Sequence, residues 1–292
     1  MRSLFFRSLG RYVLVGGRSS GTRTGRFDAS PGRQHSTRRR VTRFVGAVAL
    51  FWIVAVLVGS GSAGGSGVAR MGSTGSVPRK AFPFRYVLSD ATTGHWASVL
   101  RSVVVHRRPT ATSAVIARLS AVTNEWTQNV VLVLSGVDIG PSVTWYRVRL
   151  SILPNNATGW VPRSALGNLH AVHTHLYVNR ETFTATLRRD GRVIFTTRVG
   201  VGEPRWPTPA GQFYIRDEIT GLKPFYGPVA FGTNARSAVL TDWPGGGFIG
   251  IHGTNRPRIL PGAVSHGCIR MLNRAIVRLS RLMEVGTPLT IT

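Results

Sequence analysis

The sequence contains a single cysteine among 292 residues. One cysteine cannot form an intrachain disulfide, and it excludes multi-cysteine zinc fingers and cysteine-ligated iron–sulfur clusters. Acidic residues are also scarce, at 11 against 37 lysines and arginines, so the formal net charge is +26. A charge of this size calls for a polyanionic partner or for a membrane-topology explanation. The 42% hydrophobic content excludes a fully disordered chain.

The N-terminal charge is followed by an apolar segment. Residues 1–43 hold eleven arginines and one acid, and residues 44–58 (FVGAVALFWIVAVLV) carry no charge. With the small residues up to 63, this segment is long enough to cross a bilayer. The arginines before it place residues 1–43 in the cytoplasm and the rest outside. The sequence therefore predicts a membrane anchor over residues 44–63, with a cleaved signal peptide as the alternative, and it disfavours nucleic-acid binding.

Beyond a Gly/Ser-rich spacer over residues 64–84, residues 85–170 read as a small all-β domain. Short β-prone runs separated by Gly, Pro and Asn turns occur at 103–105, 115–116, 130–134, 145–150 and 159–161. The string WYRVRLSILPNNATGWVPRSAL resembles the C-terminal half of a bacterial SH3-like wall-binding barrel. The alternative interpretation is that Trp145 and Trp160 are simply core residues of a small barrel, whether or not it binds the wall.

Residues 171–292 read as a second, mainly β domain with one helix. Strand-like runs occur at 175–178, 182–187, 193–199, 211–215, 229–231, 238–240, 248–251 and 289–292. Asp190-Gly191 predicts a tight hairpin turn. Leu272, Ile276, Leu279 and Met283 recur at helical spacing and predict a helix that Gly286 and Pro288 end.

The cysteine lies in a motif that carries chemistry, Ser265-His266-Gly267-Cys268-Ile269-Arg270, preceded by Ile251-His252-Gly253-Thr254. Cys268 can be a nucleophile, with either His252 or His266 as its base. The Gly253 carbonyl can orient His252, and main-chain amides around Gly267 can hold an oxyanion. Arg270 adds positive potential, which favours a thiolate and can bind a carboxylate. An unpaired thiol outside the cytoplasm is exposed to oxidation, so its presence there favours a chemical role. This weakens the alternative of an inert buried cysteine.

The string IHGTNRPRILPGAVSHGCIRM resembles the catalytic signature of the L,D-transpeptidases (YkuD-like catalytic domain). VGVG at 199–202 and PTPAGQF at 207–213 resemble further elements of that family. The resemblance implies a β-sandwich with one helix. It also implies that Cys268 is the nucleophile and His252 the base, with His266, Gly267 and Gly253 completing the catalytic set.

The resemblance further implies the reaction. The family forms an acyl-enzyme at the meso-diaminopimelate carbonyl of a peptidoglycan tetrapeptide stem, releases D-Ala, and transfers the acyl group to the amine of a neighbouring stem. Carbapenems acylate the same cysteine, and neither cofactor nor metal is expected. We expect five residues at the substrate: Arg270, Ser265, Thr254, Tyr226 and Trp243. The last two lie within residues 217–247, which we expect to form a mobile flap over the stem, with an ordinary aromatic-packed loop as the alternative.

Two other functions stay open at this stage. The acyl-enzyme could be released by water, which would make the protein an L,D-carboxypeptidase or endopeptidase. A non-catalytic wall-binding protein carried by residues 85–170 is the third hypothesis. In each case the expected location is the cell membrane or cell wall, with residues 70–292 outside the cytoplasm.

Overall fold

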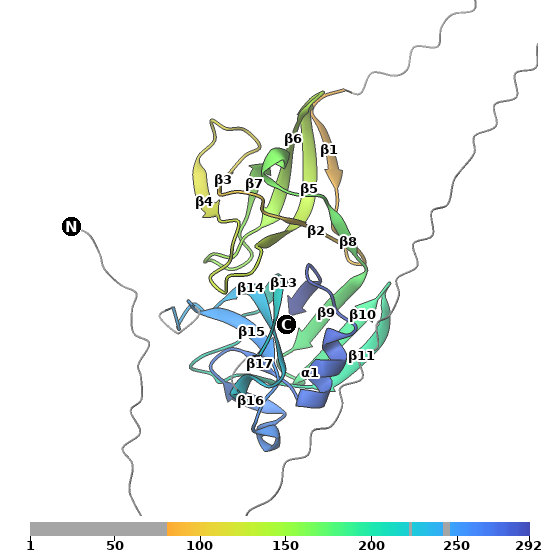
Figure 1. Ribbon diagram of the computed structural model, residues 1–292, viewed down its shortest axis with the longest axis vertical. Coiled ribbons are helices and arrows are strands. Elements are labelled where there is room, and N and C mark those ends of the chain that lie inside the picture. Colours follow the sequence, from red (N-terminus) through yellow and green to blue (C-terminus); the bar gives the residue numbers. More distant parts are fainter. Residues whose placement is uncertain (1–80, 222–223, 242–245) are drawn as a thin grey trace, which may run out of the picture. The chain divides into compact units, whose positions relative to one another are not determined.

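The computed structural model describes residues 81–221, 224–241 and 246–292 (Figure 1). The predicted basic lead, the predicted anchor over residues 44–63 and most of the spacer lie outside this set. Within it, no helix has the length and apolar character needed to span a membrane. Anchor and signal peptide therefore stay predictions.

The first described unit is an eight-stranded sheet with the order β4-β3-β7-β6-β5-β2-β8, and β1 also pairs with β5. Its strands are β1 (Phe84–Val87), β2 (Gly94–Ser98), β3 (Val103–His106), β4 (Val115–Leu119), β5 (Val130–Gly140), β6 (Val143–Arg149), β7 (Thr158–Pro162) and β8 (His170–Val172). A short 3-10 helix, η1 (Arg163–Ala165), follows β7.

Alternation along these strands explains the core of the first unit. In β6, Trp145, Tyr146 and Val148 are buried, while Val143 and Arg147 are exposed. Tyr146 and Val148 join one cluster with the buried valines of β3 and β5. Trp145 packs edge-on against His106 instead, with ring centroids 5.5 Å apart. Both aromatic and β-branched residues suit such half-buried strands. The five predicted strands are present, but the SH3-like resemblance stays a prediction.

The second unit is a ten-stranded sheet with the order β11-β10-β9-β18-β13-β14-β15-β17-β12-β16. Its strands are β9 (Thr174–Asn179), β10 (Thr184–Arg189), β11 (Arg192–Arg198), β12 (Gly200–Gly202), β13 (Gly211–Thr220), β14 (Val229–Arg236), β15 (Phe248–His252), β16 (Gly262–Ser265), β17 (Ile269–Arg270) and β18 (Pro288–Ile291). Helices in this unit are α1 (Asn273–Ser280) and the 3-10 turns η2 (Pro224–Tyr226) and η3 (Pro257–Ile259).

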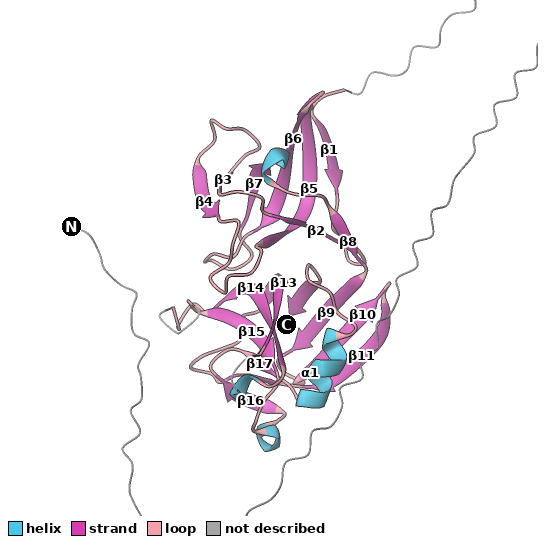
Figure 2. Cartoon of the chain, in the orientation of Figure 1, coloured by secondary structure: helices cyan, strands magenta, loops and turns pink. Residues whose placement is uncertain are grey.

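One hydrophobic core holds this second unit together. It joins Leu176 and Leu187, from strands β9 and β10, with Phe231, Ile251 and the helix residue Ile276, each no more than 1% exposed. Figure 2 shows α1 as the longest helical element among the described residues, lying beside the strands it covers. The mainly β class with one α-helix is therefore confirmed for the described chain.

Local predictions for this unit can be compared with the structure. Asp190 and Gly191 turn between β10 and β11 with positive φ values of 49° and 76°, as a tight hairpin requires. No strand forms at residues 238–240, so that prediction is wrong. The helix ends at Ser280, earlier than Gly286. Much of the described part of residues 217–247 belongs to the β13–β14 hairpin, and the flap stays a prediction.

The two sheets contact each other through buried hydrogen bonds. The Tyr214 hydroxyl of β13 donates to the Val130 carbonyl over 3.0 Å, and Asn234 Nδ2 donates to the Leu150 carbonyl over 2.9 Å. Both side chains are almost fully buried. The two sheets are therefore joined by these side-chain contacts as well as by the chain between β8 and β9.

Candidate active site

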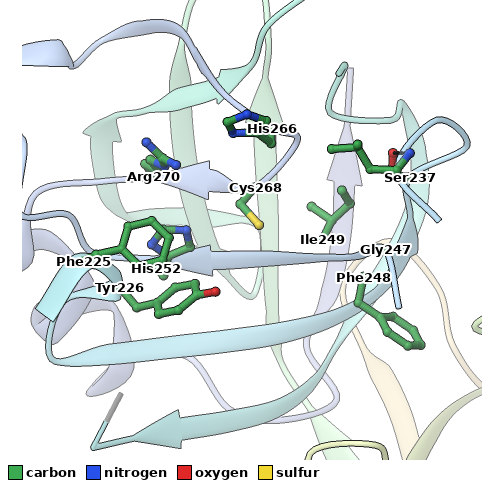
Figure 3. A pocket seen from close by; sticks show the side chains of 11 residues that line it. Phe225, Tyr226, Ser237, Gly247, Phe248, Ile249, His252, His266, Cys268 and Arg270 are labelled. Atoms are coloured by element: carbon green, nitrogen blue, oxygen red, sulfur yellow. Dashed lines mark hydrogen bonds between the residues drawn. The ribbon is translucent and has the colours of Figure 1, made fainter. Parts of the chain in front are cut away.

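Two adjacent parallel strands bring the two halves of the sequence motif together. Ile251 of β15 pairs with Ile269 of β17, and His252 pairs with Arg270. Cys268 directly precedes β17, and its sulfur points toward β15 (Figure 3). The Gly250 amide of β15 donates a hydrogen bond to that sulfur over 3.4 Å. A parallel pairing thus places the cysteine and the histidine, sixteen residues apart, side by side.

His252 is held in one tautomer. Its ring is 2% exposed, and Nδ1 lies 2.6 Å from the Gly253 carbonyl oxygen. A carbonyl can only accept, so Nδ1 carries the proton and Nε2 keeps its lone pair. Burial, aided by the charge of Arg270, lowers the pKa of His252 to about 4, although the bond to Gly253 opposes this shift. His252 is therefore a neutral imidazole at pH 7, able to accept a proton at Nε2.

The thiol of Cys268 is protonated in the resting site. Burial raises its pKa, while the Gly250 amide and the Arg270 charge act in the opposite direction. The sequence suggested that Arg270 would favour a preformed thiolate. Arg270 does act in that direction, but desolvation of the sulfur outweighs it. The pair at rest is a thiol beside a neutral imidazole.

The loop before the cysteine is braced by two hydroxyl groups. Ser265 is fully buried, donates from Oγ to the Cys268 carbonyl over 2.6 Å, and accepts from the Gly267 amide over 3.1 Å. Thr208 Oγ1 accepts from the Gly202 amide and donates to the Gly267 carbonyl, over 2.8 and 2.7 Å. The sequence suggested that Ser265 contacts substrate. Its buried hydroxyl instead positions the loop.

Gly267 is the one residue of this loop that must lack a side chain. Its φ is +113°, a conformation that residues with a Cβ rarely adopt. A Cβ there would also lie 3.0 Å from Ile249 Cδ1. Because its amide already donates to Ser265, it is not free to hold an oxyanion, which leaves the Cys268 amide as the main-chain donor of this segment.

The other half of the site is braced by the first residue of helix α1. Asn273 Oδ1 accepts a hydrogen bond from the Thr254 amide over 2.8 Å. Gly253 and Gly227 pack so closely against this side chain that a Cβ on either would clash with it. Thr254 is 3% exposed and its hydroxyl accepts from the Arg256 amide, so Thr254 also serves to position the segment.

His266 and Arg270 lie on the side of the cysteine away from β15 (Figure 3). The His266 ring stacks on Trp206 with centroids 4.0 Å apart. Arg270 Nη1 donates weakly to the Val264 carbonyl over 3.5 Å, and its guanidinium lies over Phe225. Within the described chain, the Arg270 Nε–H is buried without a hydrogen-bond partner. Arg270 therefore has donor capacity left for an anionic group.

Tyr226 packs edge-on against His252, with ring centroids 5.0 Å apart. Burial and the nearby Cys268 raise the pKa of its hydroxyl, so Tyr226 stays a neutral hydrogen-bonding group in the site. Trp243, the other aromatic residue expected at the substrate, lies outside the described residues.

Three neighbouring cavities lie in the region of Cys268. A small central cavity is lined by Cys268, His252, His266 and Arg270. On one side it adjoins a cavity of ≈ 500 Å³, here termed the Arg270 cavity, whose lining includes Arg270, Arg256 and Glu203. On the other, Cys268 and His252 also line a cavity of ≈ 220 Å³, here termed the Glu125 cavity, which includes Glu125, Arg216 and Asp217. Cys268 thus lines the central cavity and the Glu125 cavity, while the Arg270 cavity meets the central one at His266 and Arg270.

In the part of the chain that the structure describes, no group of three or more His, Cys, Asp or Glu side chains is arranged to hold a metal ion. The histidines near the junction of the two sheets have other contacts. His170 stacks on Trp96, and His175 Nε2 lies 2.8 Å from Thr290 Oγ1.

Sequence reasoning missed several residues of this site. Thr208 stood in a recognised motif without a role, and Trp206, its near neighbour, was not considered. Asn273 gave no signal beyond its place at a helix start. Glu125 and Arg216 gave no signal in the sequence, because they lie on different sheets and far apart along the chain.

Comparison with known proteins agrees with this geometry. The family model for the YkuD L,D-transpeptidase catalytic domain matches residues 173–291. YkuD of Bacillus subtilis (strain 168), a predicted L,D-transpeptidase, is 35% identical over 122 residues, which are 42% of this chain and 68% of that protein. YqjB of the same strain, also a predicted L,D-transpeptidase, is 31% identical over 126 residues, covering 40% of this chain and 70% of YqjB. The chain therefore belongs to the YkuD family of L,D-transpeptidase catalytic domains.

A mutant L,D-transpeptidase from Enterococcus faecium, solved by crystallography, is 24% identical with a TM-score of 0.33. The match covers 41% of this chain and 49% of that protein, so the chain spans about half the length of this solved structure. The family assignment rests on the family model and the two Bacillus relatives.

Proposed function

We propose that this protein is a peptidoglycan L,D-transpeptidase that works through an acyl-enzyme on Cys268. The observation that carries the proposal is the shared cavity of Cys268 and His252, with Nδ1 of His252 engaged by Gly253 and Nε2 left to accept the thiol proton. A nucleophile, an oriented base and a nearby main-chain amide are the parts that acyl transfer needs.

The first half-reaction uses the resting protonation states. As Sγ of Cys268 attacks the meso-diaminopimelate carbonyl carbon, His252 Nε2 takes the thiol proton. The carbonyl oxygen becomes an oxyanion, for which the Cys268 amide is the candidate donor. When the tetrahedral intermediate collapses, the bond to D-Ala breaks and the imidazolium returns its proton to the leaving amine. Because the pKa of His252 is depressed, its protonated form is a strong acid that favours this return.

Arg270 supports the binding of the donor stem. Its buried Nε–H without a partner and its place on both the central and Arg270 cavities suit a carboxylate of the stem peptide. The same cation stabilises the oxyanion by through-space attraction, since it already acts on the Cys268 thiol. The acceptor amine then attacks the thioester, and the thiol is regenerated.

The proposal includes location and inhibitors. We propose that the catalytic unit lies outside the cytoplasm, at the membrane or wall, and the arginine-rich lead and apolar segment of the sequence support this location. Its partners there are peptidoglycan stems as donor and acceptor. Carbapenems, whose strained carbonyl can take the place of the stem carbonyl, are expected to acylate Cys268.

The test incubates the full-length protein with a disaccharide–tetrapeptide and analyses the products by mass spectrometry. Cross-linked dimer together with free D-Ala supports transpeptidation. Tripeptide without dimer means that water is the acceptor, which makes the protein an L,D-carboxypeptidase. Cys268→Ser, nearly identical in shape, is the matched control and should give neither product. Unchanged substrate with the wild-type protein would refute the enzymatic proposal.

A further inference from the structure

A loop of the first sheet reaches the cavity that contains the nucleophile. Residues 120–129, here termed the Glu125 loop, connect β4 to β5. Glu125 from this loop lines the Glu125 cavity together with Cys268 and His252 of the second sheet. The cavity wall is therefore built by both sheets, and the catalytic domain without the first sheet would lack it.

Two side chains of the Glu125 loop bind the second sheet. Glu125 pairs with Arg216, and Thr127 Oγ1 donates to Asp217 Oδ2 over 3.3 Å. Within the loop, the Thr123 and Thr127 hydroxyls lie 2.8 Å apart. Trp126 between these anchors has φ of 63° and is 89% exposed. Since a large residue is strained at this φ and its ring packs on nothing, the anchors rather than the indole determine the loop conformation.

Arg216 and Asp217 are buried side chains that hold Glu125 in position. Arg216 Nε donates to Asp217 Oδ2 over 3.2 Å, and the guanidinium lies 4.2 Å from the centre of the Phe248 ring. The Gly232 amide donates to Asp217 Oδ1 over 2.9 Å. Arg216 and Asp217 have side chains only 4% exposed, whereas that of Glu125 is 24% exposed. Glu125 is thus the member of this network that a ligand in the cavity can reach.

The Glu125 cavity, which Cys268 lines, and the Arg270 cavity, which adjoins the central cavity, have opposite charge. The Glu125 cavity holds two carboxylates, Glu125 and Asp217, against Arg216. The Arg270 cavity holds two arginines, Arg270 and Arg256, against one glutamate. A ligand with an ammonium group is therefore attracted to the first and an anionic ligand to the second. The two substrates of a transpeptidation differ in this way at their reacting groups, because the donor stem reacts at a carbonyl and the acceptor stem at an amine.

We propose that Glu125, supplied by the first sheet, is a specificity-determining residue that receives the ammonium group of the acceptor stem in the Glu125 cavity. This inference rests on the proposed transpeptidase function and deepens it. The first sheet then selects the acceptor in addition to any role it has in wall binding.

The transfer step balances as follows. The captured ammonium loses one proton to solvent, and the neutral amine adds to the thioester carbonyl. The C–S bond breaks as the C–N bond forms, and the second nitrogen proton passes through His252 Nε2 to the Cys268 sulfur. The products are an amide cross-link and the free thiol, so no co-reactant is needed.

The test compares Glu125→Gln with the wild-type full-length protein. Glutamine keeps the size of the side chain and its ability to accept from Arg216 but removes the charge. Dimer and tripeptide both arise from one acyl-enzyme, so their ratio reports the choice between amine and water. We expect the ratio to fall, and KM for the acceptor to rise, by at least about tenfold. Glu125→Asp, which restores a carboxylate, should recover part of the ratio.

Two controls separate charge recognition from a structural role. Thr127→Val loosens the same loop without changing its charge and should leave the ratio near that of the wild type. Hydroxylamine, a small acceptor that is uncharged at pH 7, should intercept the acyl-enzyme of Glu125→Gln as well as that of the wild type.

The outcomes distinguish the two proposals. If the wild-type protein forms no acyl-enzyme, the proposed function fails first. If it forms dimer and Glu125→Gln gives the same ratio and the same acceptor KM, the role of Glu125 alone is overturned. A parallel loss of dimer, tripeptide and hydroxylamine product in Glu125→Gln would also overturn it, because that pattern means general damage to the site.

Discussion

Thr208 offers a sharp test of how the catalytic loop is held. Its side chain is 1% exposed, and its hydroxyl bridges the Gly202 amide and the Gly267 carbonyl with bonds of 2.8 and 2.7 Å. Thr208→Val removes the hydroxyl while keeping the branched shape, so it creates no large cavity. The substitution leaves two backbone groups without a partner in the protein interior.

The magnitude follows from those two groups. An unsatisfied buried donor or acceptor costs about 1–3 kcal/mol, so two cost about 2–6 kcal/mol of unfolding free energy. Catalysis should suffer as well, because the freed Gly267 carbonyl belongs to the residue before the nucleophile. A displacement of about 1 Å at a reacting group can cost about 100-fold in rate. We expect the acylation of Cys268 to slow by at least about tenfold.

Urea denaturation measures the stability, and intact-protein mass spectrometry follows the formation of a carbapenem adduct. Thr208→Ser is the matched control, since it keeps the hydroxyl and should retain most of the stability and the rate. The reasoning is refuted if the unfolding free energy of Thr208→Val lies within about 0.5 kcal/mol of the wild-type value and Cys268 of this variant is acylated at the wild-type rate.

Three further predictions concern the site. Gly267→Ala forces a Cβ into a φ of +113° and toward Ile249, so carbapenem acylation should fall by at least about tenfold, as measured by adduct formation. Asn273→Ala frees the Thr254 amide and should cost about 1–3 kcal/mol in urea denaturation. The pKa of His252 is depressed from 6.5 to about 4 in the folded chain, so protons bind the unfolded chain first as pH falls. The free energy of unfolding should therefore drop by about 3 kcal/mol between pH 6.5 and 4, a component that His252→Gln lacks.

Each of these has a control or a contradicting result. Gly140→Ala, at a position with open space and no positive φ, should change neither stability nor acylation much. Asn273→Asp keeps an acceptor oxygen and should be milder than alanine. An unfolding free energy with the same pH dependence in His252→Gln and the wild type would show that His252 is not the group that titrates.

Much of the fold was predictable because it is written in local patterns. Alternation in residues 145–150 predicted β6, and Asp190-Gly191 predicted the hairpin between β10 and β11. The short strands β16 and β17 were not predicted, and β12 was indicated only by the family resemblance of residues 199–202. These strands are two to four residues long, too short for a periodic pattern, and their neighbours in the sheet supply their hydrogen-bond partners.

Protonation states could not be read from the motif. The residues around Cys268 indicate a cysteine nucleophile with an activating arginine, but the sign of the net shift in its pKa depends on how much water reaches the sulfur. Desolvation outweighs Arg270 in the folded site. The role of Ser265 could not be read from the motif either. Its place there allows a contact with substrate, but in the folded chain its hydroxyl bonds to the backbone.

The sequence alone determined the family, the nucleophile and base expected from its motif, and the class of each domain, because these depend on residue identity and spacing along the chain. Only the tertiary structure decided what surrounds the sulfur and which elements share its cavity. Glu125 and Cys268 are 143 positions apart, and no local pattern links them. They line one cavity because Arg216 and Asp217 bind a loop of the other sheet.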